Sequence, residues 1–207
     1  MKKLIVAGIA AGAFFCMPAY AASPVFDWSG FYVGAEAGGG WGMAGVRGIA
    51  NDADLSGALG GVQIGNNWQN GNWVTGVKAD INLSHIRGSV DWGGAIYSGT
   101  INSFGTAEAQ GGVLLTPTGL LYATGGFAWG HVKAKLADIE TFQDARTMGG
   151  WTAGLGFAWT LTPTTSAFVE FKHLDLGTKT FVLDDPEQVH VRFNVIKAGM
   201  NWKYGTR

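Results

Sequence analysis

The chain has 207 residues, which suits one domain, and its 14 Lys and Arg residues nearly balance 15 Asp and Glu residues, for a formal net charge of −1. This balance does not suggest a nucleic-acid-binding domain, which would need a strongly basic face. Only 14% of the residues are charged, which is few for a water-soluble surface, while 34 are Gly and 9 are Trp.

The first element that we expect is a secretory signal peptide over residues 1–21. Lys2 and Lys3 precede an apolar run, residues 4–15, and Ala19-Tyr20-Ala21 has the small-x-small form of a cleavage site. The run is too short to cross a bilayer as a helix. Cleavage after Ala21 would also remove Cys16, the one cysteine of the sequence, so we expect a mature chain without disulfides or thiol sites.

A short segment, residues 22–30, follows the leader, and we place it in the periplasm. From Phe31 onward the residues alternate, with Phe31, Val33 and Ala35 on one face and polar or small residues such as Glu36 on the other. Alternation of this kind is typical of a membrane-spanning strand. Strands cross lipid only as a closed barrel, because every backbone polar group must then be paired within the protein.

Eight segments of this type can be laid out along the chain, with alternately long and short connections. Turn signals mark the short connections, at Asn70-Gly71, Pro117 and Pro163. Because outer-membrane barrels have short periplasmic turns and longer extracellular loops, we predict an all-β fold. It is an eight-stranded antiparallel transmembrane β-barrel over residues 31–204, with four longer extracellular loops and a C-terminal tail, 205–207. The expected strands are 31–41, 58–68, 73–83, 102–115, 120–130, 148–161, 166–176 and 189–204.

Aromatic residues gather at both ends of the predicted outer face, as expected for membrane girdles. The predicted periplasmic girdle consists of Trp68, Trp73, Trp159, Trp202 and Tyr204. The predicted outer girdle consists of Trp41, Trp129 and Trp151. A soluble periplasmic β-barrel is the alternative, but it would need a polar outer face, and the outward rows of 73–83 and 148–161 are apolar.

Two segments do not have a clear outer face. Apolar residues occupy both faces of 120–130, and in 189–204 the apolar residues change from odd to even positions near Val195-Ile196. A β-bulge at that point would bring both halves of the last strand onto one face.

Charged residues occupy the predicted inward face. They are Glu36, Lys78, Asp80, Glu108, Glu170, Lys172 and Lys197. A charge held at membrane depth must be paired or hydrated, because burying it alone is costly. We interpret the set as a salt-bridged plug, and the alternative is a narrow path for water or ions. Nothing supplies a nucleophile or an oriented base beside these carboxylates, so we do not expect catalysis.

Four segments carry a resemblance to a known family: WSGFYVG at 28–34, YATGG at 122–126, VEFKHLDLG at 169–177 and KAGMNWKY at 197–204. The chain resembles the small porin-like outer-membrane β-barrel proteins of alphaproteobacteria, whose architecture is that of the OmpA-type eight-stranded domains. The resemblance implies an outer-membrane location and a structural or surface-exposed role. The ending Trp202-Lys203-Tyr204 resembles the signal read by the barrel-assembly machinery. Family members often carry two inward arginines where this chain has Glu108 and Gln110.

All four histidines are predicted at extracellular strand ends: His85, His131, His173 and His190. Neutral imidazole binds metal ions and haem iron, and some members of the family that the chain resembles bind haem. Histidines that converge at the rim from several strands would therefore capture haem or a divalent metal ion. The other interpretation is that histidine simply suits a polar rim.

These observations predict a non-enzymatic outer-membrane β-barrel protein with a role in envelope structure and surface contact, and at most narrow passage of small solutes. A haem or metal receptor is the alternative. We expect a monomer without a resident cofactor, in contact with outer-membrane lipid and lipopolysaccharide and with the barrel-assembly machinery during insertion.

Overall fold

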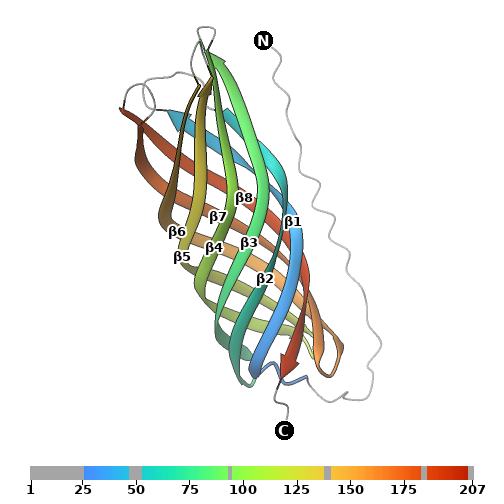
Figure 1. The fold of residues 1–207 in the computed structure, drawn as a ribbon. Helices are drawn as coiled ribbons and strands as arrows, with labels where there is room; N and C mark the ends of the chain where they lie inside the picture. The colour runs from blue at the N-terminus through green and yellow to red at the C-terminus, as the bar shows by residue number, and fades with distance from the viewer. Residues whose placement is uncertain (1–25, 47–52, 93–94, 138–140, 183–185, 205–207) are drawn as a thin grey trace, which may run out of the picture.

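The computed structural model describes residues 26–46, 53–92, 95–137, 141–182 and 186–204. Its strands form one closed antiparallel barrel in chain order, in which the last strand pairs with the first (Figure 1). The predicted eight-stranded antiparallel barrel is therefore confirmed. The described strands are β1 (Gly30–Val46), β2 (Ala53–Asn70), β3 (Trp73–Trp92), β4 (Ala95–Thr116), β5 (Gly119–Ala137), β6 (Thr141–Thr162), β7 (Thr165–Val182) and β8 (Pro186–Tyr204). No described residue belongs to a helix long and apolar enough to cross a membrane. The expected signal peptide lies outside the described residues.

The strands extend further than the sequence predicted, at the end of the barrel away from the short turns. β3 continues from 83 to Trp92 and pairs with β4 as far as Trp92↔Ala95. Most of each expected long connection is therefore paired strand. The sequence analysis missed these extensions because it searched for an apolar outward face, which a strand needs only where it meets lipid.

Short connections join the strands at the opposite end, which we call the turn end. Gly71 follows β2 with a positive φ of 58°. Among the described residues, only glycines have a positive φ. Positive φ at only the first of the two central residues, Gly71 and Asn72, fits a type II′ hairpin turn. Pro117 and Pro163 take the first position of the other two turns, and a register shift lies beside each, at Leu114/Thr116 and Thr160/Thr162.

The two ambiguous segments have a definite orientation. β5 buries Leu120, Tyr122 and Ala128 in the lumen and exposes Phe127. β8 pairs with β1 from Val189 to Tyr204 without a register shift, so the bulge that would have reconciled the two halves of this strand is not present near Val195-Ile196. Odd positions of β8 face the lumen from Val191 to Lys203. The apolar residues of β8 change from odd to even positions because the lumen itself is apolar at the far end, not because the strand rotates.

Glycines on the inward face make room for tyrosine rings. Tyr32 is paired with Gly65, and Tyr122 with Gly156. A Cβ atom at either glycine would collide with the ring of its paired tyrosine. Because such rings lie flat against the barrel wall, the narrow lumen holds large side chains without widening.

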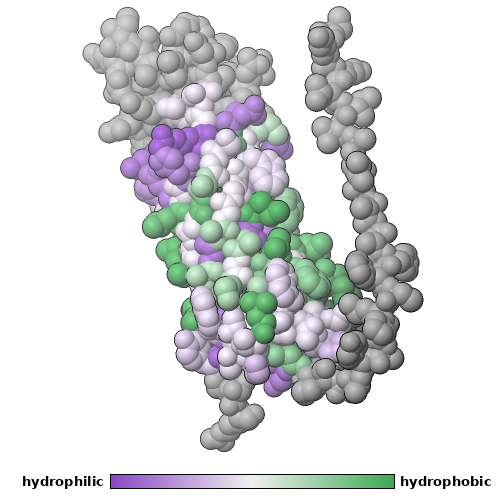
Figure 2. Space-filling view, turned by 90° about the vertical axis from the view of Figure 1, so that its right-hand side faces the viewer, coloured by the Kyte–Doolittle hydropathy of each residue, from purple (hydrophilic) through white to green (hydrophobic). Residues whose placement is uncertain are grey.

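The outer face carries a band of exposed apolar side chains around the middle of the barrel. On the face shown in Figure 2, hydrophobic residues form this band, and hydrophilic residues gather beyond it toward the far end. Members of the band include Val62, Ile64, Val77, Ile81, Leu83, Phe127, Leu155, Val169, Phe171 and Ile196. Exposed apolar side chains in this number require an apolar solvent.

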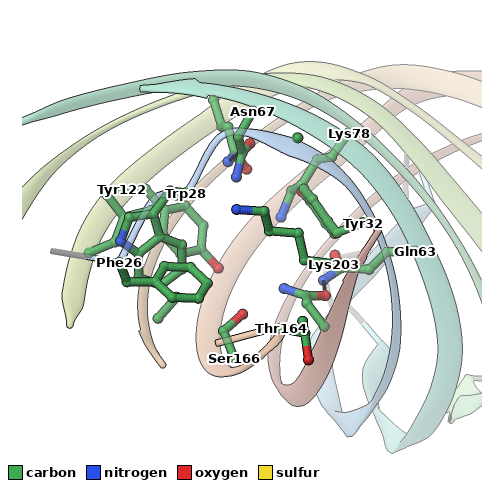
Figure 3. Close-up of a pocket in the computed structure, with 15 residues that line it drawn as sticks. Phe26, Trp28, Tyr32, Gln63, Asn67, Lys78, Tyr122, Thr164, Ser166 and Lys203 are labelled. Atoms are coloured by element: carbon green, nitrogen blue, oxygen red, sulfur yellow. Dashed lines mark hydrogen bonds between the residues drawn. The ribbon is translucent and has the colours of Figure 1, made fainter. Parts of the chain in front are cut away.

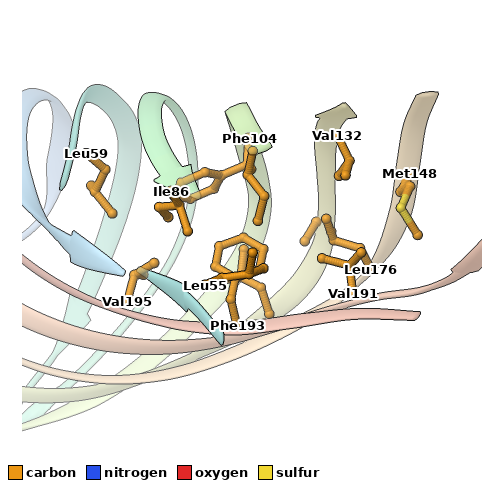
Figure 4. Close-up of a cluster of buried hydrophobic side chains, with 13 residues drawn as sticks. Leu55, Leu59, Ile86, Phe104, Val132, Met148, Leu176, Val191, Phe193 and Val195 are labelled. Carbon is orange, nitrogen blue, oxygen red and sulfur yellow. The ribbon is translucent and has the colours of Figure 1, made fainter. Parts of the chain in front are cut away.

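The lumen contains two clusters of buried apolar side chains. The far apolar layer (Figure 4) consists of Leu55, Leu59, Ile86, Ile101, Phe104, Ala128, Val132, Met148, Leu174, Leu176, Val191, Phe193 and Val195. The near apolar layer, at the turn end, consists of Trp28, Val74, Leu120, Tyr122, Ala158 and Phe168. The charged residues of the lumen lie between these two layers along their strands.

Candidate functional site

A layer of charged side chains crosses the lumen. Its members occupy inward positions of β1, β3, β4, β7 and β8. We call it the central charged layer: Glu36, Lys78, Asp80, Glu108, Glu170, Lys172 and Lys197. These are the seven residues that sequence alternation placed inward, and each is at most 6% exposed.

Lys172 is the main connection between strands in this layer. Its Nζ lies 2.6 Å from Asp80 Oδ2 and 2.7 Å from Glu108 Oε2. It also lies 3.2 Å from Glu170 Oε1 and donates to Thr106 Oγ1 at 3.2 Å. One ammonium group therefore links β7 to β3 and β4 across the lumen.

The other two lysines, Lys78 and Lys197, form further ion pairs in this layer. Lys197 Nζ lies 2.7 Å from Glu36 Oε1 and 3.3 Å from Asp80 Oδ2. Lys78 donates to Glu170 Oε2. Together with Lys172, these contacts form one continuous network in which every carboxylate has a cationic partner.

Neutral donors add hydrogen bonds to three of the acids, since four carboxylates face only three ammonium groups. Thr106 Oγ1 and Asn82 Nδ2 donate to Asp80, at 2.7 Å and 2.8 Å. Tyr122 Oη donates to Glu170 at 2.8 Å, and Thr124 Oγ1 donates to Glu108 at 3.3 Å. The sequence analysis did not assign these residues a role, although Thr106 and Asn82 have the same parity as the charged residues Glu108 and Asp80 on their strands.

The hydroxyl groups within this network are all engaged as hydrogen-bond donors. The hydroxyls of Thr106, Thr124 and Tyr122 all donate to carboxylates. The lysines are held as ion-pair partners. Chemically, the layer can hold strands together and oppose the passage of ions, because a charge moving through it would have to displace paired groups.

The far apolar layer lies in the lumen beyond these charges. Phe104 and Phe193 meet edge to face, with ring centroids 5.4 Å apart and an interplanar angle of 76°. Both side chains are at most 1% exposed. The odd-numbered apolar residues of β8 were a partial signal for this layer at the level of the sequence.

At the turn end, a segment before β1 folds into the mouth of the barrel. The backbone N–H of Trp28 donates to Gln69 Oε1 at 2.7 Å, and Ser29 Oγ accepts from the N–H of Gln69 at 3.0 Å. The Trp28 side chain is 5% exposed, and Phe26 packs against it with ring centroids 5.0 Å apart. The sequence analysis placed this segment in the periplasm and did not predict that it enters the lumen.

Lys203, near the end of β8, holds the same segment from the other side. Its Nζ lies 5.1 Å from the centre of the Phe26 ring and donates to the carbonyl oxygen of Asp27. The Ser29 N–H donates to the Asp27 carboxylate at 2.8 Å, which lowers the pKa of Asp27. The segment is thus fixed to both β2 and β8.

A small cavity of about 40 Å³ lies beneath this segment (Figure 3). Polar side chains line it along with the aromatic ones, among them Gln63, Asn67, Lys78, Ser166 and Asn201. Its size suits a few water molecules rather than a solute, since one water needs roughly 10–15 Å³.

The residues assigned to the aromatic girdles all occupy outward positions. Trp73 and Tyr204 are 67% and 59% exposed at the turn end. At the other edge of the apolar band, Trp41 and Trp151 are 46% and 52% exposed. The remaining members lie on the same two levels: Trp68, Trp159 and Trp202 at the turn end, and Trp129 at the other edge.

The four histidines do not come together. His85, His131, His173 and His190 lie on β3, β5, β7 and β8, each beside an inward residue, so their side chains point away from the lumen. His173 Nδ1 lies 2.8 Å from Asn194 Oδ1, and His190 Nδ1 lies 3.0 Å from Thr178 Oγ1. The expected convergence on a haem or metal site is therefore absent from this arrangement. In the described part of the chain, no three His, Cys, Asp or Glu residues are placed to hold a metal ion.

Comparison with known proteins agrees with this architecture. Residues 7–204 match the family model of the outer membrane protein β-barrel domain. The 31 kDa outer-membrane immunogenic protein of Brucella melitensis is 31% identical over 244 aligned positions, which cover 99% of this chain and 100% of that protein. The 22 kDa outer membrane protein of Rhizobium leguminosarum bv. viciae is 31% identical over 165 positions, which cover 78% of this chain and 70% of that protein.

Among solved structures, the outer membrane protease OmpT of Escherichia coli matches with a TM-score of 0.53 at 10% identity, covering 84% of this chain and 96% of that one. Neisserial surface protein A matches with a TM-score of 0.48 at 15% identity, covering 85% and 98%. At such low identity, the likeness to OmpT concerns the barrel fold alone.

Proposed function

Because this chain belongs to the outer membrane protein β-barrel domain family and resides in the Gram-negative outer membrane, we propose that it is a non-enzymatic envelope protein. Its closed barrel anchors long surface hairpins and does not conduct solutes. In this family orientation, the turn end faces the periplasm and the far end faces the exterior.

The observation that carries this proposal is the order of layers in the lumen. A hydrated ion entering from outside would first meet the far apolar layer, with Phe104 and Phe193 packed at its centre. It would then have to separate Lys172 from Asp80 and Glu108, which lie 2.6 and 2.7 Å away. Both steps are costly, because an ion loses its water in the first and leaves buried charges unpaired in the second.

A conductance measurement tests the closed lumen. We expect purified protein in planar lipid bilayers to show no steady, voltage-independent current, whereas a general porin in the same lipid does. Insertion is verified by the mobility shift of unboiled protein on a denaturing gel after recovery from the bilayer lipid. A reproducible open state in verified wild-type protein would contradict the proposal.

The length of the strands supports a surface role. β3 has 20 residues, and at about 3.3 Å per residue and a tilt of about 40° it rises roughly 50 Å. This is about twice the ~25 Å height of an outer-membrane apolar band, so the far part of the strand projects outside the membrane. The Brucella relative's description as an immunogenic outer-membrane protein fits the same role.

Single cysteines test which end is outside, since the expected mature chain has none. We expect Ser89→Cys, exposed on the far part of β3, to react in intact cells with a maleimide that cannot cross the outer membrane. Asn72→Cys, exposed in a short turn, is the matched control and should react only after the membrane is permeabilised. The reverse pattern would overturn the orientation.

A further inference from the structure

The outward residues of β3 change character abruptly at the edge of the apolar band. Leu83 is 73% exposed and is the last apolar outward residue described on this strand. His85 and Arg87 follow on the same outer face, and the intervening Ile86 is fully buried in the far apolar layer. Arg87 therefore stands just outside the level at which the strand leaves lipid.

β5 repeats this order two strands away. Trp129 at the edge of the band is followed on the outer face by His131 and Lys133, while Val132 between them is 4% exposed and faces the lumen. The succession of apolar residue, histidine and cation is the same on both strands.

The pairing of the strands brings the two cations into one row. Thr100 of β4 pairs with Arg87 on one side and with Lys133 on the other. Because neighbouring strands are about 4.8 Å apart, the backbones carrying the two cations are separated by roughly 10 Å. We call this surface the basic patch: His85, Arg87, Thr100, His131 and Lys133.

The cations of the basic patch have no acidic partner among the described residues. Arg87 contacts His85, with Nη2 3.3 Å from Nδ1, and its register partner on β2 is the neutral Ser56. The opposite side of the barrel differs, since Arg192 of β8 lies directly across from Asp175 of β7 in the strand register. His190 also approaches Asp175 there, with Nε2 3.4 Å from Oδ1.

We propose that the basic patch binds the phosphate groups of the glycolipid in the outer leaflet. This inference rests on the orientation given under the proposed function, which sets the patch at the level of the outer headgroups. Arginine offers a planar fork of donors that matches phosphate, and lysine adds a second point charge. Because the two cations come from strands on either side of β4, the patch offers two separate positive groups to a headgroup that carries two phosphates.

The test compares two neutralised cations with a matched control. Heat-modifiability of the purified, detergent-solubilised barrel is measured with phosphorylated lipid A, with dephosphorylated lipid A and with inorganic phosphate. We expect phosphorylated lipid A to raise the unfolding temperature of the wild type. In R87Q/K133Q, the concentration needed for half of that effect should rise roughly tenfold or more, because hydrogen bonds to charged groups are lost.

Two further variants keep the outcome unambiguous. R87K/K133R retains both charges and should keep most of the response to phosphorylated lipid A. R192Q removes an outward cation that already faces an acid, and this variant should respond as the wild type does. Equal responses of the wild type and R87Q/K133Q would overturn the proposal. Equal effects of the two forms of lipid A, or a full effect of inorganic phosphate alone, would overturn it as well. None of these outcomes depends on whether the barrel conducts.

Discussion

Lys172 illustrates at the residue scale why a buried charge is tolerated in this barrel. Its side chain is completely buried, and its ammonium group reaches Asp80, Glu108 and Thr106 at once. An ammonium group has three donors and no acceptor, so these three contacts satisfy it fully. The buried charge of Lys172 is therefore tolerated because of the geometry of its contacts as well as their charge.

Replacing Lys172 by methionine should be among the most destabilising single changes in the barrel. Methionine keeps most of the volume but leaves Asp80 and Glu108 facing each other without the shared cation. Removing one partner from a buried ionic set typically costs about 3–5 kcal/mol. The measurement is the free energy of unfolding in urea, with the gel mobility shift as readout.

The control for that prediction removes the carboxylate charge of Glu108, which Lys172→Met leaves without its shared cation, and does not restore the ion pair. Glu108→Gln in the Lys172→Met background returns the layer to the formal charge of the wild type, and we expect it to recover part of the loss. If Lys172→Met were as stable as the wild type, the network would contribute nothing to holding β7 against β3 and β4.

At the scale of single strands, β8 shows that alternation separates the two faces of a strand but does not identify the face that meets lipid. The even-numbered residues Ile196, Met200 and Trp202 face outward as alternation predicted. The odd-numbered apolar residues above them were read as a second lipid-facing run, because an inward face was expected to be polar. A period of two residues distinguishes the faces of a strand but does not say which face meets lipid.

Cysteine substitutions test the continuous phase of β8. We expect Arg192→Cys to react with a maleimide in the native barrel, because this position is exposed, and Phe193→Cys to be protected, because the phenylalanine is fully buried. A bulge near Val195 would reverse the two results. Labelling after boiling shows that both cysteines are intrinsically reactive.

The segment before β1 acts as a lid on the cavity at the turn end, and Trp28 is its main anchor. Trp28→Ala should open the mouth to water, because it removes the ring that packs against Leu120 and Phe168 in the near apolar layer. We expect Ser166→Cys, which lines the cavity and is 7% exposed in the wild type, to react slowly in the wild-type background. It should react at least several-fold faster with Trp28→Ala.

An unchanged labelling rate of Ser166→Cys would mean that other side chains cover the cavity without Trp28. The matched control is Asn72→Cys, which lies in an exposed turn outside the lumen and should label at the same rate in both backgrounds.

At the scale of the whole molecule, the sequence predicted the number of strands, their antiparallel order and the outward or inward position of the charged residues. Those features follow from local alternation and from turn residues such as Gly71 and Pro117. The contacts between Lys172 of β7 and Asp80 of β3 did not follow, because they depend on the register of all the strands between them. The lid was missed because Trp28 precedes the first alternating strand.

The three lumen layers act in series, so opening one of them should not create a pore. Phe104→Ala/Phe193→Ala removes the aromatic pair at the centre of the far apolar layer but leaves Lys172 bound to Asp80 and Glu108. We therefore expect this variant to be less stable than the wild type, by about 3–5 kcal/mol for each well-packed ring, yet still silent in planar bilayers. Steady current through the folded double variant would show that the far apolar layer alone closes the barrel and that the central charged layer is already permeable.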